Sequence, residues 1–341
     1  ENSETYNNEE VFTEEELEEE DTQAGMTIGD FTVRNKNMTE LGHWKGAYDL
    51  YDVEFDGSLA YIATRGYGLR CVNFSDFNNP EEIGHFKLVP EGAEVNNSFN
   101  ILRLTGDTAV IGTAPEKEMP EVLTVNITDP TNITLLDRFT LNWDPELNLN
   151  AQGNYVVDIV TEGNLIYVAS VYSVSQGGDY ETTTIDDATQ FSIFNISDPT
   201  SITPVKQMNM SGDSFALSRY GHYVYLSYYT FSDVSEYGLR IIDVGNPSQA
   251  TLVNNYSLAG DGMEESMQPA AKDLLIDGHF LYAGMSEKIL IYDLSDPTIP
   301  TLYHTINATD ADDLIVKGNW LYYTQTSAFG EPTGYTALCT V

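Results

Sequence analysis

Apolar and polar residues alternate along most of the chain in short runs, which is the pattern of half-buried β-strands. The runs come in groups. The first two runs of a group are joined by an X-Gly or Gly-X pair such as Asp56-Gly57 or Asp277-Gly278, a strong hairpin signal. The third run ends in a Ser-Asp-Pro or Asn-Pro cluster, because Pro cannot donate to a strand ladder and Asp bonds its own backbone in turns. A fourth run follows, so each group predicts four strands.

This group repeats with a period of about 40 to 50 residues. The fullest copy spans 51–63, 67–76 and 79–86, and further copies lie within 221–247 and 277–297. A fixed period with several short strands per unit indicates the blades of a propeller. The units open near residues 51, 101, 157, 215, 272 and 312, which predicts six blades.

We therefore expect an all-β fold, a six-bladed β-propeller over residues 31–341, preceded by an acidic N-terminal arm at 1–30. The predicted blades lie near 49–94, 98–141, 154–210, 213–258, 270–307 and 311–341. The last blade has only three strands of its own. Glu40-Leu-Gly-His-Trp44 copies the fourth strand Glu82-Ile-Gly-His-Phe86, so segment 31–44 is expected to complete the last blade and to remove its exposed edge.

The repeated unit resembles the LVIVD repeat. The likeness is carried by Gly68-Leu-Arg-Cys-Val-Asn73, by Gly238-Leu-Arg-Ile-Ile-Asp243 and by the Asp-Pro or Asn-Pro turns after them, and it extends over roughly residues 40 to 341. The resemblance implies a propeller fold and a surface or exported protein of bacteria or archaea. It implies no shared catalytic motif.

The composition limits the kinds of partner that the protein can bind. The formal net charge of −38 excludes ordinary nucleic-acid binding, which needs basic patches against phosphate, and predicts repulsion from anionic membranes. No stretch approaches the 18 or so consecutive apolar residues of a membrane-spanning helix, so we expect no membrane insertion. The chain begins at Glu1 rather than Met, which is typical of a mature product whose signal peptide has been removed.

Asn-x-Ser/Thr sequons are more frequent than the roughly four that composition predicts by chance. They begin at Asn37, Asn73, Asn96, Asn126, Asn132, Asn195, Asn209, Asn255 and Asn307. Asn73, Asn126 and Asn195 occupy one repeat position where other units carry Asp243 and Asp293, so turn chemistry alone could retain those three. The others favour an exported, extracellular protein that carries N-linked glycans.

One set of carboxylates recurs at a fixed place in the unit. Five residues before the hairpin glycine lie Asp52, Asp158, Asp273 and Asp313, whereas the other two units carry Ile101 and Ala216. Innermost strands line the channel of a propeller, so these carboxylates are expected to gather at one mouth, where Ca²⁺ is the cation that they suit. The alternative is that each Asp bonds the backbone of its own loop.

Two cysteines also share a repeat position, Cys71 in the first unit and Cys339 in the last. Packed sheets lie about 10 Å apart, whereas a disulfide requires Cα atoms within about 7 Å. We expect two buried free thiols.

The N-terminal arm is strongly acidic. Residues 1–21 contain eleven Asp or Glu and no basic residue. Thr13 and Glu16 have capping-box spacing, and Val11, Phe12 and Leu17 give a short segment one apolar face. We expect this arm to dock, either on its own propeller or on a neighbouring copy, and the second case generates head-to-tail assembly.

No catalytic motif appears: there is no HExxH, CxxC, G-x-S-x-G or Gly-rich phosphate loop. The sequence favours a non-catalytic, extracellular structural protein that assembles with itself into a cell-surface filament or layer through its arm. One alternative is a surface adhesin that binds a glycan or a protein through the insertion at 173–189. Another is a metal-assisted hydrolase or lyase with a site at the channel mouth.

Overall fold

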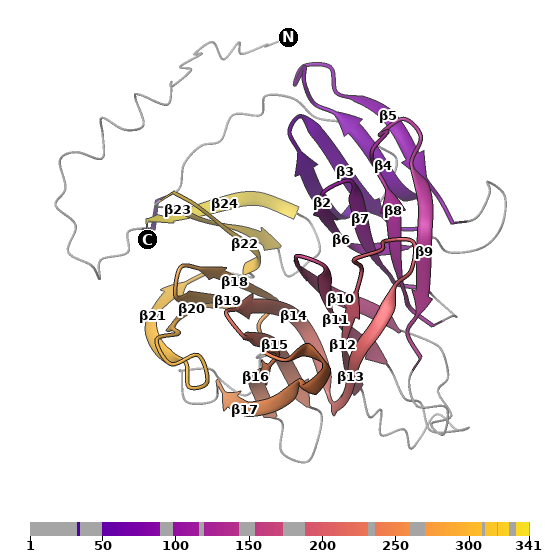
Figure 1. Ribbon diagram of the computed structural model, residues 1–341. Coiled ribbons are helices and arrows are strands. Elements are labelled where there is room, and N and C mark those ends of the chain that lie inside the picture. The colour runs from indigo at the N-terminus through magenta and orange to yellow at the C-terminus, as the bar shows by residue number, and fades with distance from the viewer. Residues whose placement is uncertain are drawn as a thin grey trace, which may run out of the picture.

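A computed structural model of the chain describes residues 33–34, 50–88, 98–115, 119–142, 154–172, 188–230, 236–258, 270–308, 311–318, 320–326 and 332–340. Within these ranges the protein is almost entirely β-strand, and the strands form six four-stranded antiparallel sheets (Figure 1). The all-β prediction is confirmed. The expected arm at 1–30 and residues 173–187 of the predicted insertion at 173–189 lie outside the described residues, and Ala188 and Thr189 begin β12.

Strands follow one another in chain order within each of the first three sheets. The first sheet contains β2 (Leu50–Asp56), β3 (Leu59–Thr64), β4 (Gly68–Asn73) and β5 (Glu81–Phe86). The second contains β6 (Phe99–Thr105), β7 (Thr108–Thr113), β8 (Glu121–Asn126) and β9 (Thr134–Thr140). The third contains β10 (Tyr155–Glu162), β11 (Leu165–Tyr172), β12 (Ala188–Asn195) and β13 (Thr203–Ser211).

The fourth and fifth sheets keep this order, and the last does not. The fourth contains β14 (Asp213–Tyr220), β15 (Tyr223–Thr230), β16 (Glu236–Asp243) and β17 (Thr251–Ser257), with a 3-10 turn at Pro247–Gln249. The fifth contains β18 (Asp273–Asp277), β19 (Phe280–Gly284), β20 (Lys288–Asp293) and β21 (Thr301–Asn307). The last contains β22 (Ala311–Lys317), β23 (Trp320–Thr326), β24 (Pro332–Thr340) and β1 (Val33–Arg34).

The fourth strand of the last sheet comes from the other end of the chain. β1 pairs antiparallel with β24, and Val33 lies opposite Cys339 while Arg34 lies opposite Leu338. These residues belong to the segment 31–44 that was expected in this place. The motif at 40–44, which suggested the closing strand, lies outside the described residues.

Successive sheets pack through their innermost strands, each against the next along the chain, from β2 and β6 to β18 and β22. In Figure 1 the sheets succeed one another around a common centre, from the indigo first sheet to the yellow last one, as the blades of a propeller do. The core therefore lies between sheets. For example, Leu102 of β6 packs against Tyr61 and Ala63 of the first sheet.

The first hairpin of every sheet turns at a glycine with a left-handed backbone, where φ lies between 56° and 60°. These are the predicted X-Gly positions, and this φ matches the tight turns that suit the strand twist. The glycines are Gly57, Gly106, Gly163, Gly221, Gly278 and Gly318.

The turn between the third and fourth strands is built from two consecutive side-chain-to-backbone hydrogen bonds. In the first, Oδ1 accepts the N–H two residues on, at Asn73, Asn126, Asn195, Asp243 and Asp293. In the second, the same bond forms at Asp76, Asp129, Asp198 and Asp296. At the last three of these residues, bonds from a Thr hydroxyl and a Thr amide hold the pKa of the carboxyl below its usual range.

The same turn docks onto the preceding sheet. The Thr124 hydroxyl of β8 donates to the Pro199 carbonyl at 2.6 Å, and the Tyr225 hydroxyl of β15 donates to the Pro297 carbonyl at 2.7 Å. At Gly84 of β5 the contact is closer still, because an added Cβ would lie 1.9 Å from the Pro130 oxygen. The repeated turn is therefore a contact between units as well as a strand connection.

Tyr282 of β19 is the equivalent of Tyr225, since each lies opposite the central Ile of the third strand. Its side chain is fully buried, yet its hydroxyl has no hydrogen-bond partner among the described residues. The next sheet is the last one, and within its described residues no such turn follows β24, because the fourth place is taken by β1. In the part of the chain that the structure describes, the fifth sheet thus has a donor without the acceptor that Pro199 and Pro297 supply in other sheets.

Cys71 is buried and free, as expected. The side chain of Cys339 lies outside the described residues. A bridge between the two is excluded because Cys71 carries none.

The two equivalent tyrosines give a matched test. Tyr225→Phe removes a hydrogen bond and leaves the Pro297 carbonyl without its donor, so we expect a loss of about 1 kcal/mol or more in the free energy of unfolding. Tyr282→Phe removes a buried hydroxyl that bonds nothing, so it is expected to be neutral or stabilising. Urea unfolding of both variants measures the difference. Equal losses would show that the turn contact does not stabilise the protein.

Candidate functional site

Three of the four predicted carboxylates lie at equivalent positions on innermost strands of alternate sheets: Asp52 on β2, Asp158 on β10 and Asp273 on β18. In each, Oδ1 accepts the N–H of the next residue, at 2.7 to 2.8 Å. This local bond is the alternative that the sequence left open. The bond holds each carboxylate against the backbone of its own innermost strand.

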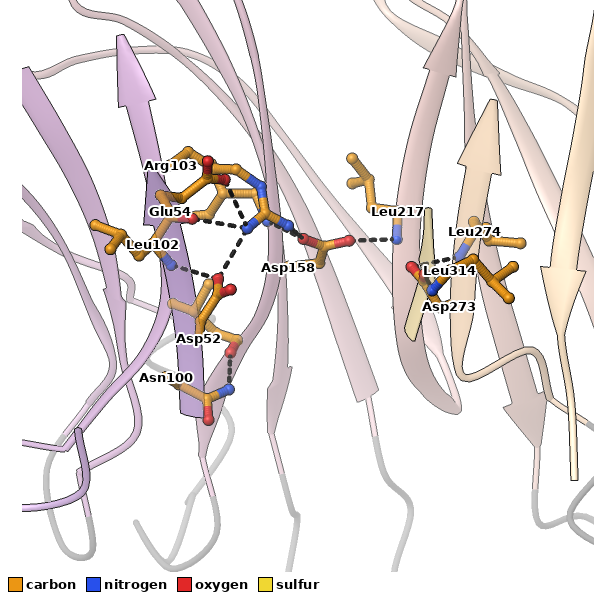
Figure 2. A network of polar contacts seen from close by, with 12 residues as sticks. Asp52, Glu54, Asn100, Leu102, Arg103, Asp158, Leu217, Asp273, Leu274 and Leu314 are labelled. Atoms are coloured by element: carbon orange, nitrogen blue, oxygen red, sulfur yellow. Dashed lines mark hydrogen bonds and ion pairs between the residues drawn. The ribbon is translucent and has the colours of Figure 1, made fainter. Parts of the chain in front are cut away.

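The second oxygen of each carboxylate reaches the next sheet. Oδ2 of Asp52 accepts the Leu102 N–H at 2.8 Å, that of Asp158 the Leu217 N–H at 2.9 Å, and that of Asp273 the Leu314 N–H at 2.7 Å. These carboxylates therefore join the first sheet to the second, the third to the fourth and the fifth to the last (Figure 2). The receiving sheets have no bridging Asp of their own, which explains why Ile101 and Ala216 stand at that position in two of them.

Asp313 differs from the other three. It lies on β22, is exposed, and exchanges hydrogen bonds with Thr324 of its own sheet: its N–H donates to the Thr324 hydroxyl at 3.1 Å, and its Oδ2 accepts from that hydroxyl at 3.3 Å. No bridge from Asp313 to β2 is present among the described residues.

Arg103 of β6 is the cation of this network, and sequence reasoning missed it. Its Nη1 donates to Asp52 at 2.8 Å and its Nη2 to Asp158 at 2.7 Å, while Glu54 lies 3.7 Å away (Figure 2). One guanidinium thus ties the first three sheets together. The signal was available: the equivalent innermost positions carry Glu54, Val160, Ser218, Leu275 and Ile315, so the Arg is unmatched in the repeat.

The electrostatics follow from burial and from the excess of carboxylates. Burial acts to lower the pKa of Arg103, but Asp158, Asp52 and Glu54 outweigh it and the pKa is raised. Burial raises the pKa of the Asp273 carboxyl to about 7, and the negative charges of Asp158 and Asp313 add to that rise. The carboxylates are therefore close enough to influence one another, and Arg103 neutralises only part of their charge.

The geometry of the carboxylates is that of a set of clamps. Their oxygens point at backbone amides and at Arg103, and the described residues contain no group of three or more His, Cys, Asp or Glu arranged to hold a metal ion. Calcium at Asp52, Asp158, Asp273 and Asp313 stays a prediction from the sequence. What the arrangement does is hold innermost strands of neighbouring sheets in register.

The predicted glycosylation residues fall into three groups. Asn73, Asn126 and Asn195 are half-buried, and their Oδ1 atoms make the turn bonds described above, which leaves each Nδ2 outside that bond. Asn37 and Asn96 lie outside the described residues. The exposed ones are Asn132, in the turn before β9, and Asn209, Asn255 and Asn307, in β13, β17 and β21.

The first and last sheets each leave an apolar face uncovered. Val53 of β2 is 47% exposed and Ile315 of β22 is 59% exposed. Val53 has the position of Leu102, Ile159, Leu217, Leu274 and Leu314, all of which are buried against the preceding sheet. Leu50 and Phe55 flank Val53 on the same face of the strand, across the β-bulge at Tyr51, and are also exposed.

Comparison with known proteins identifies the repeat. The LVIVD repeat model matches residues 211–257 and 270–308, the fourth and fifth sheets, which confirms the resemblance for these units. No curated protein matches the sequence.

Solved structures resemble this one only loosely. Saccharomyces cerevisiae Sqt1 gives a TM-score of 0.48 at 10% identity over 90% of this chain and 87% of its own. The computationally designed Ika8 protein gives 0.47 at 11% identity over 86% and 83%. Likenesses at this level say nothing about function. The described part of the chain also holds no helix with the length and hydropathy of a membrane span.

Of all single substitutions in this network, removal of the Arg103 cation should lower the free energy of unfolding the most. Arg103→Gln leaves Asp52, Asp158 and Glu54 without their counter-charge, and we expect a loss of about 3 kcal/mol in unfolding free energy at pH 7.5. The control is Arg138→Gln, because Arg138 is exposed and its Nε lies 4.0 Å from Glu121; it should change stability by less than about 0.5 kcal/mol. Equal effects in urea unfolding would contradict the role of Arg103.

The raised pKa of Asp273 predicts a pH dependence. The folded state binds this proton more tightly than the unfolded state, so the contribution of Asp273 to stability falls as pH rises from about 4 to about 7 and is constant above that. Asp273→Asn lacks this pH-dependent contribution, so the stability of the variant should increase relative to that of the wild type as pH rises from about 4 to about 7. Thermal unfolding at several pH values measures the difference.

Asp296→Asn is the control with the opposite sign. Its pKa is lowered, so its contribution is lost only as pH falls below about 4. A wild-type-minus-variant difference for Asp273→Asn that stays flat between pH 4 and 7 would contradict the assignment.

Proposed function

We propose that this LVIVD-repeat β-propeller is a non-catalytic, extracellular structural protein whose copies assemble into a cell-surface filament or layer through the N-terminal segment. The observation that carries the proposal is the composition of the last sheet. Its edge strand, β1, comes from the opposite end of the chain and pairs with β24 through Val33 and Arg34. A terminal strand that completes a distant sheet is an element that copies can exchange.

The exposed faces on either side of the junction support exchange. Val53 is exposed although its counterparts in the other sheets are buried, and Ile315 is exposed whereas Val160 and Leu275 at its position are half-buried. Closer association of a first and a last sheet would bury Val53 and Ile315, whether the two sheets belong to one chain or to two. Burial of apolar side chains of this size favours association by about 1.5–3 kcal/mol each.

The polar chemistry of the described residues supports a structural role. The bridging carboxylates and Arg103 bond one another and the backbone between sheets, and the Asn and Asp residues of the repeated turns bond their own backbone. An enzyme needs groups poised toward a substrate, whereas these groups are directed at the protein itself. The exposed sequons favour an extracellular location.

A cross-strand disulfide distinguishes exchange between copies from closure within one chain. Val33→Cys places a thiol opposite the native Cys339, and Cys71 does not compete because it is buried. After mild oxidation, we expect a ladder of covalent oligomers on a non-reducing gel that collapses to the monomer on reduction.

Arg34→Cys is the matched control. It lies opposite Leu338, one residue out of register with Cys339, so it should give little cross-linking. A Val33→Cys product that runs only as an internally linked monomer would overturn assembly through this strand. No linkage in either variant would overturn it as well, because the strand pairing itself would then be absent.

A further inference from the structure

The outermost strands of the sheets are exposed edges. β5, β9, β13, β17 and β21 each lie at one end of their sheet, with strand neighbours on one side only. An unpaired edge is a template on which a strand of another molecule can add, and proteins commonly protect such edges with charged side chains.

Charge protects only some of these edges. β5 carries Glu81 and Glu82, and β9 carries Asp137 and Arg138. β17 reads Thr-Leu-Val-Asn-Asn-Tyr-Ser and β21 reads Thr-Leu-Tyr-His-Thr-Ile-Asn, so neither contains an Asp, Glu, Lys or Arg, and β13 contains only Lys206. In a chain with a net charge of −38, uncharged edges are unexpected.

The uncharged edges also expose side chains that favour strand addition. Val253 of β17 is 45% exposed and Tyr303 of β21 is 41% exposed. A short segment of β-branched and aromatic residues with low charge and no Pro is the type that pairs with further strands. By their composition β17 and β21 are therefore the most adhesive edges among the described strands.

The sequons coincide with these edges. Asn209, Asn255 and Asn307 lie within β13, β17 and β21 and are exposed, whereas β5 and β9 contain no sequon. The carboxamide of Asn209 uses its Oδ1 to accept from Gln190 at 3.0 Å, which leaves Nδ2 outside that bond. Strands β17 and β21 thus carry a sequon Asn and no Asp, Glu, Lys or Arg, β5 and β9 carry charges and no sequon Asn, and β13 carries one of each.

We propose that N-linked glycans on Asn209, Asn255 and Asn307 protect the edge of the third sheet, which carries a single charge, and the uncharged edges of the fourth and fifth sheets, in place of the several charges that protect the first two. This inference rests on the export that the proposed function includes. A second strand must approach to about 4.8 Å to pair, and a hydrated oligosaccharide on the edge strand blocks that approach.

The modification needs a sugar donor that the secretory machinery of the cell supplies, a lipid-linked oligosaccharide phosphate or diphosphate. The Asn Nδ2 forms a bond to the anomeric carbon of the donor sugar, and the bond from that carbon to the phosphate oxygen breaks. The lipid phosphate leaves with the electron pair, and Nδ2 loses one proton to a base of the transferase. No oxidant or reductant takes part.

The test compares full-length protein made in a glycosylating host with a triple variant, Asn209→Gln, Asn255→Gln and Asn307→Gln. Mass spectrometry of glycopeptides from the wild type should show oligosaccharide on all three residues. Light scattering after size-exclusion chromatography should show that the triple variant shifts from the wild-type distribution to larger, concentration-dependent species. Infrared spectra of those species should show added intermolecular strand pairing.

Two further variants make the result specific. Asn132→Gln removes an exposed sequon that lies in a turn, so it should leave the size distribution unchanged. Val253→Lys with Tyr303→Lys, added to the triple variant, restores charge to the two bare edges and should return the protein to the wild-type distribution. Rescue by charge would not occur if the triple variant were simply misfolded.

The outcomes separate this inference from the proposed function. Glycans on the other sequons but not on these three would overturn the inference and leave export standing, and so would a triple variant with the wild-type distribution. Failure of the lysines to reverse the association would also overturn it. A wild type without sugar on any sequon would overturn both the inference and the extracellular location.

Discussion

Each sheet of this protein has two apolar faces, and it can remove both from water only by lying between two other sheets. This constraint governs the rest of the structure. Leu102, Ile159, Leu217, Leu274 and Leu314 are buried because each packs on the sheet before it, and the repeated turn carries a Pro carbonyl to the same neighbour. Because burial is shared between units, a sheet at either end of the series has one face left over. Val53 and Ile315 lie on those two exposed faces.

Packing between sheets brings innermost strands close together, and their backbone amides then need acceptors. Asp52, Asp158 and Asp273 meet this need by bonding one amide in their own strand and one in the next sheet. This arrangement brings several negatively charged carboxylates close to one another, which is unfavourable. Arg103 offsets part of this charge for the first three sheets, whereas no cation of the described residues offsets the charge of Asp273, and its pKa rises to about 7.

The same constraint links architecture to the proposed function. A linear series of sheets has a leftover face at each end and a leftover edge on each unit. At the ends, the leftover faces and a terminal strand, β1, provide contacts that a single chain or several chains can satisfy. At the edges, β5 and β9 carry charge, and β13, β17 and β21 carry sequons. In the assembly that we propose, association would depend on the ends, while charge and glycans would keep the edges from pairing.

Much of the fold could be predicted from the sequence because it depends on local interactions. The X-Gly hairpins, the alternating runs and the Asn/Asp turns are short-range features whose conformations depend on neighbouring residues, so they predicted the all-β unit, its repeat and the strand from the N-terminal region in the last sheet. The four carboxylates were found by register. Their role was not, because the partners of Asp52, Asp158 and Asp273 are backbone amides, which carry no sequence signal, and Asp313 differs from them only in its surroundings. The partners of Arg103, the exposure of Val53 and Ile315, and the lack of a partner for the Tyr282 hydroxyl among the described residues were decided by tertiary structure, although the repeat register already marked Arg103 as unmatched. Each depends on what a neighbouring sheet brings within a few ångströms, and residues more than 40 positions apart in the chain make that contact.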